Sequence, residues 1–129
     1  MAEIRLINNM CGILHYLDIP LLDFEIRNRE LVKAVELSGG KYYPWELACL
    51  GISYGSINKF FERRTMKENC MFYREHLDAI GMKVFDFDTY IKKNNGNNHL
   101  DNFWVRFDNF GAKSFDDICN QEYPVRWED

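Results

Sequence analysis

The sequence has no long hydrophobic run and few of the short motifs that mark common catalytic sites. No apolar stretch approaches the roughly 18 residues that a membrane-spanning helix needs. The first residues, MAEIRLINN, lack the apolar core of a signal peptide. We therefore expect a soluble, cytoplasmic protein that does not bind a membrane. A glycine-rich phosphate loop, an H-E-x-x-H motif and the H-R-D and D-F-G motifs of protein kinases are also missing, so we expect a protein that is not an enzyme.

Cysteine and histidine are present but too scattered to predict a metal site. No C-x-x-C pair occurs, and the histidines do not have a zinc-binding spacing, so we expect no metal and no cofactor. Free thiols fit a reducing compartment, where cysteine packs as a small hydrophobic residue, and we predict that role for all four cysteines. A Cys–His nucleophile pair assembled by the fold is left open. The residues concerned are Cys11, Cys49, Cys70, Cys119, His15, His76 and His99.

The chain also lacks a large excess of either positive or negative charge. Sixteen Lys and Arg residues stand against twenty Asp and Glu residues, which gives a net charge of −4 over 129 residues. Hydrophobic residues make up 47% of the chain and aromatic residues 16%, enough to fill a core. This composition excludes a disordered tail, a coiled coil and a strongly basic nucleic-acid module. We expect one domain over residues 1–129 and no direct binding to nucleic acid.

The first third of the chain predicts an antiparallel meander. Residues 13–17 form a short run compatible with a strand, and residues 22–27 alternate apolar and charged side chains with a period of two. Asn28-Arg29 is a plausible turn. An apolar pattern then returns over residues 31–37, and Ser38-Gly39-Gly40 ends it. We interpret these segments as three strands.

The middle and end of the chain predict short helices. Pro44 and Gly51 bracket a first helix, and residues 57–61 continue the helical spacing. Residues 65–68 have the S/T-x-x-E form of a capping box, which predicts a helix from there to Gly81. Further predictions are a short helix over residues 85–91, a flexible loop over residues 92–98, and a helix that begins at Ser114. The fold class is therefore α+β, with an N-terminal antiparallel β-meander packed against three or four short helices.

Positive charge is concentrated in one segment of this acidic chain. Five basic residues face only two acidic ones between residues 59 and 74, whereas residues 101–129 carry seven acidic and three basic residues. One interpretation is a patch that binds an acidic partner or phosphate. The other is an ordinary solvated surface with weak ion pairs. The candidate partner-binding residues are Lys59, Arg63, Arg64, Lys67 and Arg74.

Paired carboxylates and paired aromatics are two further candidate sites. The carboxylates at residues 86 and 88 or at residues 116–117 have the chemistry to hold Mg²⁺, but Asp86 and Ser114 lie where helix caps are expected. The aromatic pairs at residues 60–61 and 103–104 resemble base-stacking platforms. Adjacent residues on a helix point in different directions, however, so at least one ring of each pair is expected in the core.

Several segments resemble the N-terminal region of HipA-like kinases, as found in short Firmicutes-type proteins. Residues 14–26, LHYLDIPLLDFEI, are similar to the family's "L-M-H-K-D-I-P-V-A-E-L-E-I". Residues 60–65, FFERRT, and residues 74–77, REHL, correspond in order to an aromatic, arginine-bearing helix and an "R-E-x-L" helix. Residues 98–105, NHLDNFWV, are similar to "S-L-S-D-Q-Y-W-I".

The chain departs from this family in three places. Lys67 stands where the family usually has proline, residues 38–43 diverge, and the family's "W-E-D" occurs only at residues 127–129. The resemblance implies a non-catalytic module without the kinase domain, which acts as an accessory or antitoxin-like subunit. Its expected partner is another protein, for example a kinase-like toxin. The alternative is a phage or mobile-element protein that inhibits a host nucleic-acid machine.

Overall fold

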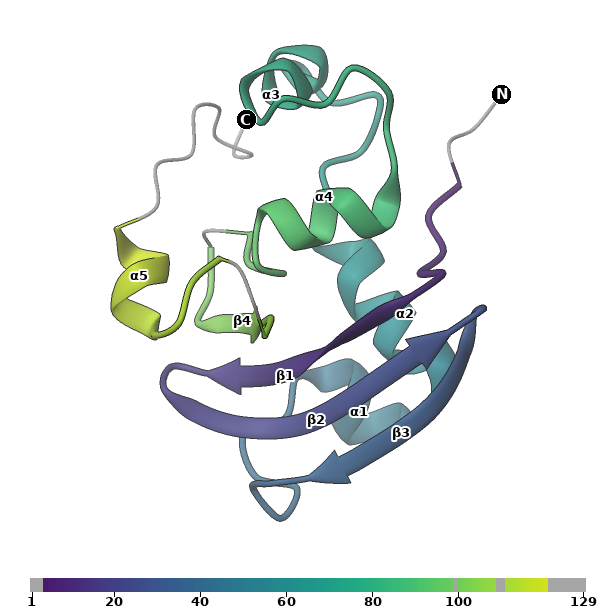
Figure 1. The fold of residues 1–129 in the computed structure, drawn as a ribbon, viewed down its shortest axis with the longest axis vertical. Helices are drawn as coiled ribbons and strands as arrows, with labels where there is room; N and C mark the ends of the chain where they lie inside the picture. Colours follow the sequence, from purple (N-terminus) through teal and green to yellow (C-terminus); the bar gives the residue numbers. More distant parts are fainter. Residues whose placement is uncertain (1–3, 99, 109–110, 121–129) are drawn as a thin grey trace.

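The protein folds into a four-stranded antiparallel sheet with five helices among the residues that the structure describes (Figure 1). The structure is a computed structural model and describes residues 4–98, 100–108 and 111–120. The predicted α+β class is confirmed. In chain order the elements are β1 (Met10–Tyr16), β2 (Ile19–Arg27), β3 (Glu30–Glu36), α1 (Trp45–Leu50), α2 (Tyr54–Arg63), α3 (Tyr73–Ala79), α4 (Phe87–Lys93), β4 (Phe103–Arg106) and α5 (Phe115–Cys119).

The sheet has the strand order β3-β2-β1-β4. The predicted meander of three strands is confirmed, and Asn28 and Arg29 form its second turn with φ angles of 51° and 64°. Positive φ at both turn residues matches the right-handed twist of the paired strands. β4 was not predicted as a strand. It pairs with the other edge of β1, where Leu14 lies opposite Val105.

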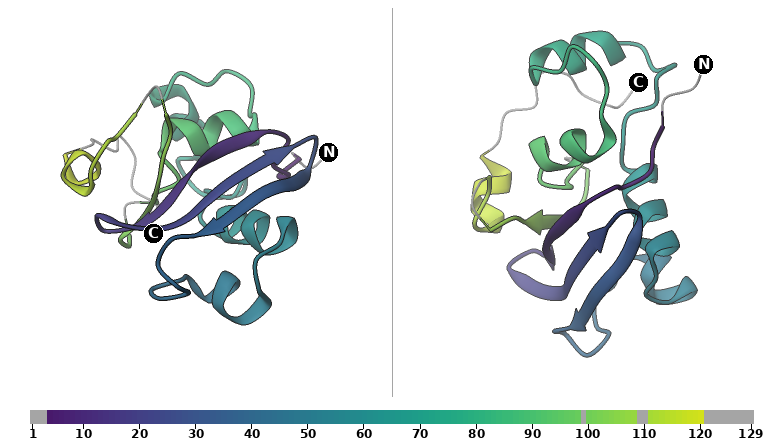
Figure 2. Two further views of the ribbon diagram at one scale, coloured as in Figure 1. Left: turned by 60° about the horizontal axis from the view of Figure 1, so that its bottom comes forward. Right: turned by 45° about the vertical axis from the view of Figure 1, so that its right-hand side comes forward.

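Helices cover the two faces of the sheet unequally (Figure 2). One face buries Leu14, Phe24 and Ile26 against residues of α1, α2 and α4 in the main core. On the other face, next to β4, Trp104 is fully buried and packs with Ile118 of α5. α3 lies farthest from the sheet and belongs to a separate cluster with Met66, Leu77, Met82 and Tyr90.

The predicted helix over residues 65–81 is wrong in its first half. The Thr65 hydroxyl donates to the carbonyl oxygen of Phe61 at 2.7 Å, so it closes the end of α2 instead of capping a new helix. Phe72 has a left-handed φ of 69°, and α3 begins only at Tyr73. The spacing of a capping box does not show whether the threonine hydroxyl bonds to the helix that precedes it or to the residues that follow it.

The predicted flexible loop over residues 92–98 is also wrong, because three of its four asparagines are buried and hydrogen-bonded. Asn95 serves both backbone groups of Val105. Its carbonyl oxygen accepts from the Val105 N–H at 2.7 Å, and its Nδ2 donates to the Val105 carbonyl oxygen at 3.1 Å. Asn97 Nδ2 donates to two carbonyl oxygens in the segment that leads into β4. Asn94 Nδ2 caps a carbonyl of α4. These asparagines therefore fix the position of β4 by hydrogen bonds.

All four cysteines are exposed, so the prediction that they pack in the core is wrong. We expect each thiol of the native protein to react with a maleimide without denaturant. Cys11 should react most slowly at neutral pH, because partial burial raises the pKa of its thiol and the nearby Glu25 carboxylate adds to that effect. Peptide mass spectrometry after timed alkylation at pH 7 and pH 8.5 measures this. A cysteine that reacts only after unfolding in urea would contradict the exposed position of its side chain in the structure.

The buried histidines predict acid sensitivity. His76 is fully buried, with its Nε2 3.0 Å from the Tyr90 hydroxyl oxygen, and burial lowers the pKa of this imidazole. Burial likewise lowers the pKa of His15, which stacks on Trp104. Below about pH 6.5 the unfolded chain therefore takes up protons that the folded chain excludes.

We expect the free energy of unfolding to fall by about 1 kcal/mol for His76 between pH 7.5 and pH 5.5. Urea titrations at these two pH values measure this fall. A His76→Gln variant should show a smaller decline than the wild type, whatever its stability at pH 7.5. An equal decline in both proteins would assign the acid sensitivity to other groups.

Candidate functional site

The five predicted partner-binding residues do not form one surface. Lys59 and Lys67 are exposed, and neither has an ion pair within the part of the chain that the structure describes. Arg63 is exposed and pairs with Glu46, at 3.1 Å between Nη1 and Oε2. Arg74 pairs with a neighbour on its own helix. Arg64 is buried, with only 9% of its side chain exposed, so its charge does not contribute to a partner surface.

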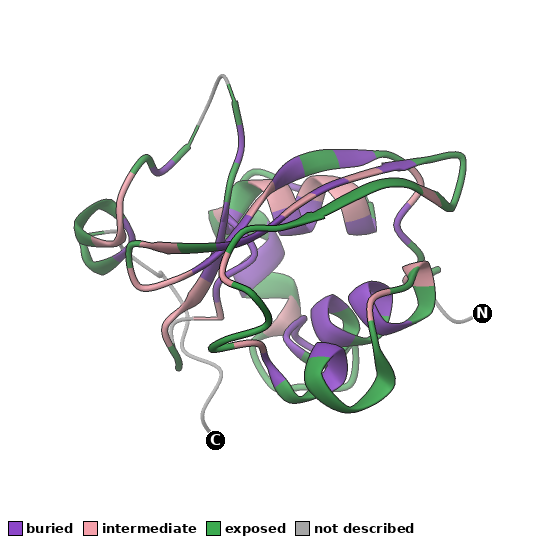
Figure 3. Ribbon diagram, turned by 90° about the horizontal axis from the view of Figure 1, so that it is seen from below, coloured by how far each residue is buried: buried purple, intermediate pink, exposed green. Residues whose placement is uncertain are grey.

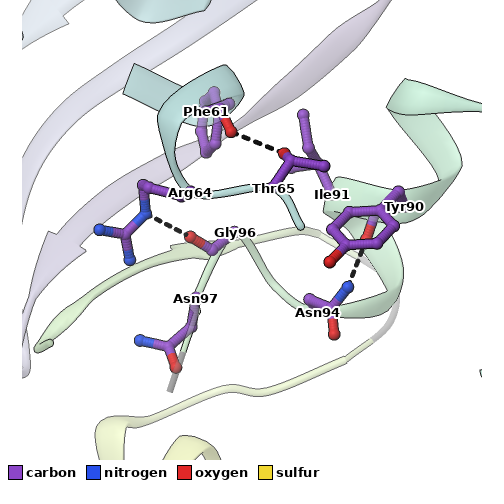
Figure 4. Close-up of a pocket in the computed structure, with 8 residues that line it drawn as sticks. All are labelled: Phe61, Arg64, Thr65, Tyr90, Ile91, Asn94, Gly96 and Asn97. Atoms are coloured by element: carbon purple, nitrogen blue, oxygen red, sulfur yellow. Dashed lines mark hydrogen bonds between the residues drawn. The ribbon is translucent and has the colours of Figure 1, made fainter. Parts of the chain in front are cut away.

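Arg64 instead joins α2 to the segments before β4. Its Nε donates to the carbonyl oxygen of Gly96 at 3.1 Å (Figure 4), and Nη2 donates to the Phe103 carbonyl oxygen at 3.0 Å. Both terminal nitrogens also donate to the Asp101 carboxylate, with Nη2 2.7 Å from Oδ1. The guanidinium lies over the Phe60 ring, 4.6 Å from its centroid. This forked arrangement, in which the guanidinium makes four hydrogen bonds, is specific to arginine and serves the fold.

Arg64 also lines a small internal cavity between α2 and α4, shown in Figure 4. Aromatic and aliphatic side chains of these helices form part of the wall, and the asparagine loop after α4 closes it. The cavity has a volume of about 10 Å³, which leaves room for about one water molecule.

An open groove lies on the outer side of the same arginine. It runs between α1, the end of α2 and the segment that leads into β4. Its most accessible groups are Trp45, which is 56% exposed, and Arg63, whose side chain is 58% exposed. The Arg63 guanidinium carbon lies 5.7 Å from the centroid of the Trp45 ring. The residues that line the groove are Pro44, Trp45, Glu46, Phe60, Arg63, Arg64, Asn98, Asp101 and Phe103.

A row of aromatic rings extends from this groove. Phe103 contacts Tyr16 with ring centroids 5.2 Å apart, and Tyr16 stacks in parallel on Tyr42 at 5.6 Å. Tyr42 is 55% exposed and holds a left-handed φ of 66°. Large residues adopt this conformation at an energetic cost, and such residues cluster at functional sites. The groove and this row together present tryptophan, tyrosine and arginine, the residue types that dominate binding energy at protein interfaces.

The carboxylate candidates have structural roles. Asp86 caps α4 by accepting from the Thr89 N–H at 3.1 Å, and Ser114 caps α5, so both predicted caps are confirmed. Asp88 accepts from the backbone N–H groups of two residues that precede β1. Within the described ranges, no three His, Cys, Asp or Glu residues are grouped to hold a metal ion. The prediction that each aromatic pair places at least one ring inside is confirmed, since Phe60, Phe61 and Trp104 are buried.

Residues 51–55, GISYG, have the G-x-S-x-G spacing of a hydrolase nucleophile elbow. That elbow needs a strand before the serine and a strained turn at it. Here α1 precedes the segment, and Ser53 has an extended φ of −154°. Its hydroxyl accepts from the Ser56 N–H at 3.1 Å as the N-cap of α2. The segment therefore starts a helix, and sequence spacing alone does not reveal this.

Comparison with known proteins gives no family assignment. No family model matches the chain, and neither a curated protein nor a solved structure matches it. No helix among the described residues has the length and apolar character needed to cross a bilayer.

Proposed function

We propose that this chain is a non-catalytic protein-interaction module that binds a partner protein at the groove beside Trp45. The carrying observation is that Trp45 and Arg63 stack on each other while each stays more than half exposed. A tryptophan left on the surface beside an arginine is the composition of an interface hot spot. The resemblance to the N-terminal region of HipA-like kinases supports an accessory or antitoxin-like role in the cytoplasm, with a kinase-like toxin as the partner.

The chemistry of the groove supports recognition by packing with a limited electrostatic contribution. Glu46 already neutralises part of the Arg63 charge, and Arg64 is paired with Asp101 inside the protein. Lys59 lies one helical turn before Arg63 on the exposed side of α2. A partner that places an apolar side chain on Trp45 and a carboxylate near Lys59 and Arg63 would satisfy both features.

A test of this proposal compares binding variants of the groove. We expect Trp45→Ala to weaken binding of the partner, captured from the native host and then purified, at least tenfold. Lys59→Glu should mainly slow association and reduce its dependence on salt, because peripheral charges act on the encounter rate. Surface plasmon resonance at two salt concentrations measures both effects.

The matched control is Val84→Ala, which truncates an apolar side chain that is 81% exposed and lies outside the groove. Its affinity should equal that of the wild type. Affinity unchanged by Trp45→Ala, or reduced equally by the control, would refute the groove as the binding site. Arg64 is unsuitable for this test, since its replacement perturbs the fold.

A further inference from the structure

A second surface, separate from the groove, gathers exposed apolar side chains. Of the twelve large hydrophobic residues exposed within the described ranges, six lie between residues 32 and 50. Tyr42 and Trp45 belong to the groove and its aromatic row. The other four are Val32, Val35, Leu37 and Leu50, each between 45% and 53% exposed. Single exposed apolar residues are ordinary, but several along one uncovered sheet edge indicate an interaction surface. Val35 lies opposite Asp23, on the sheet face away from α1, so these side chains flank the β3 edge from both faces of the sheet.

β3 supplies one half of this surface. It forms the edge of the sheet, and six of its seven residues are exposed. An uncovered edge offers a row of backbone N–H and C=O groups to another strand, which proteins commonly prevent with free charges. Two of the three charged residues of β3 have partners within the protein. Lys33 Nζ lies 3.0 Å from the Asp23 carboxylate, and Glu36 accepts from the Tyr43 hydroxyl at 3.1 Å.

α1 supplies the other half. Its residues Glu46 and Leu47 are buried, whereas Ala48, Cys49 and Leu50 are exposed and carry no charge. β3 is the lowest strand and α1 the lowest helix in Figure 1, so Figure 3, seen from below, looks onto both of them. The edge strand and the apolar end of the helix thus lie on the same side of the molecule.

We propose that a second copy of this chain covers this surface, by antiparallel pairing of β3 with β3 around a two-fold axis perpendicular to the sheet. That operation continues the sheet from four to eight strands and places the α1 and α2 helices of the two copies on the same face of the joined sheet. It therefore brings α1 of one copy next to α1 of the other. One symmetry operation covers both halves of the surface.

The sequence of β3 and the charges around it favour a second copy over an unrelated protein. A register centred on Ala34 places Lys33 opposite Val35 of the second copy, on the sheet face that carries Asp23 and Glu25, with no like charges directly opposed. A register centred on Lys33 would oppose two lysines and is excluded. The uncharged end of α1 meets its own copy without repulsion, and it offers no charged group that would select a different partner.

The size of the surface predicts a weak dimer. A seven-residue strand is about 24 Å long, and a sheet with its helix layer is roughly 20 Å deep. Each copy would then bury roughly 500 Å², a total near the lower limit of about 1,000 Å² for specific interfaces. The dissociation constant should therefore lie in the micromolar range or above.

Sedimentation velocity of the full chain alone tests this inference, across concentrations from low micromolar to several hundred micromolar. We expect a reversible increase from monomer to dimer mass. Val35→Lys, which adds a charge beside the two-fold axis, should stay monomeric throughout, and Leu50→Lys should weaken the dimer. Val84→Lys is the matched control and should dimerise like the wild type. Both Val35 and Val84 are exposed, so thermal unfolding should show that these variants fold normally.

Hydrogen exchange of the wild type at the lowest and highest concentration identifies the surface. We expect protection of β3 backbone amides to rise with concentration, while that of β4 stays constant. A chain that is monomeric at every concentration, a dimer undisturbed by Val35→Lys, or a dimer without added protection in β3 would each overturn the inference. Because no partner protein is present, these outcomes are separate from those of the groove test.

Discussion

Replacing Arg64 with alanine is expected to lower the free energy of unfolding by about 3 kcal/mol. The change removes a buried guanidinium that donates to the Gly96 and Phe103 carbonyl oxygens and to the Asp101 carboxylate. The buried Gly96 carbonyl oxygen then loses this donor, and the Phe103 carbonyl oxygen keeps only the donation from Asn97 Nδ2. For a chain of this length, a loss of that size corresponds to a drop in melting temperature on the order of 10 °C, which calorimetry measures.

The adjacent arginine provides a matched control. Arg63→Ala removes the same side chain from the next position of α2, but Arg63 is 58% exposed and has one ion pair, so its loss should cost less than about 1 kcal/mol. Arg64→Lys should recover only part of the stability, because an ammonium group cannot reach three acceptors in a forked geometry. Equal losses for the two alanine variants would show that the buried network contributes little.

Replacing Gly96 with alanine is expected to cost about 3 kcal/mol as well, for steric reasons. Gly96 has a φ of 63°, a conformation that costs a residue with a Cβ roughly 1–2 kcal/mol. The added Cβ would also lie 2.9 Å from a ring carbon of Phe61 and 3.0 Å from a methyl carbon of Val105. Overpacking of this kind typically adds about 1–3 kcal/mol. Urea unfolding of the variant measures the total.

Gly39→Ala separates the two contributions. Gly39 has a similar φ of 67°, but nothing lies within 4 Å of its added Cβ. This variant should lose only the backbone contribution, about 1 kcal/mol. If Gly39→Ala and Gly96→Ala lowered the free energy of unfolding by the same amount, the close packing around Gly96 would not contribute to the cost of its replacement.

The parts of the fold set by local patterns were predictable from the sequence. The alternation over residues 22–27 specifies a half-buried strand, and the turn at Asn28-Arg29 specifies a tight hairpin. The caps Asp86 and Ser114 act within three residues of themselves, so their roles follow from short spacings. In each case the interaction that decides the structure lies close in the sequence.

The parts set by distant contacts were not predictable. Arg63 and Arg64 are neighbours with the same charge, yet one is exposed and the other buried, because Asp101 and Gly96 meet only Arg64. The asparagines of residues 92–98 have the composition of a flexible loop. They are ordered by distant partners, because Asn95 bonds both backbone groups of Val105 and Asn97 donates to the Phe103 carbonyl oxygen. The candidate site was predicted only from the number of basic residues in one segment of the sequence. It therefore grouped the buried Arg64 with exposed residues such as Arg63.

The late position of β4 in the chain has a consequence for biosynthesis. β4 pairs with β1 some ninety residues earlier, and the Trp104 indole N–H donates to the Leu17 carbonyl oxygen at 2.6 Å across the same gap. During translation the β1–β3 meander can form early, but one edge of β1 stays unpaired until β4 leaves the ribosome. Ribosome-bound chains that stop before Phe103 should therefore expose the seven-residue β1 as the second sheet edge, in place of the four-residue β4 whose Val105 backbone groups are bonded by Asn95. Such chains should depend on chaperones to avoid aggregation.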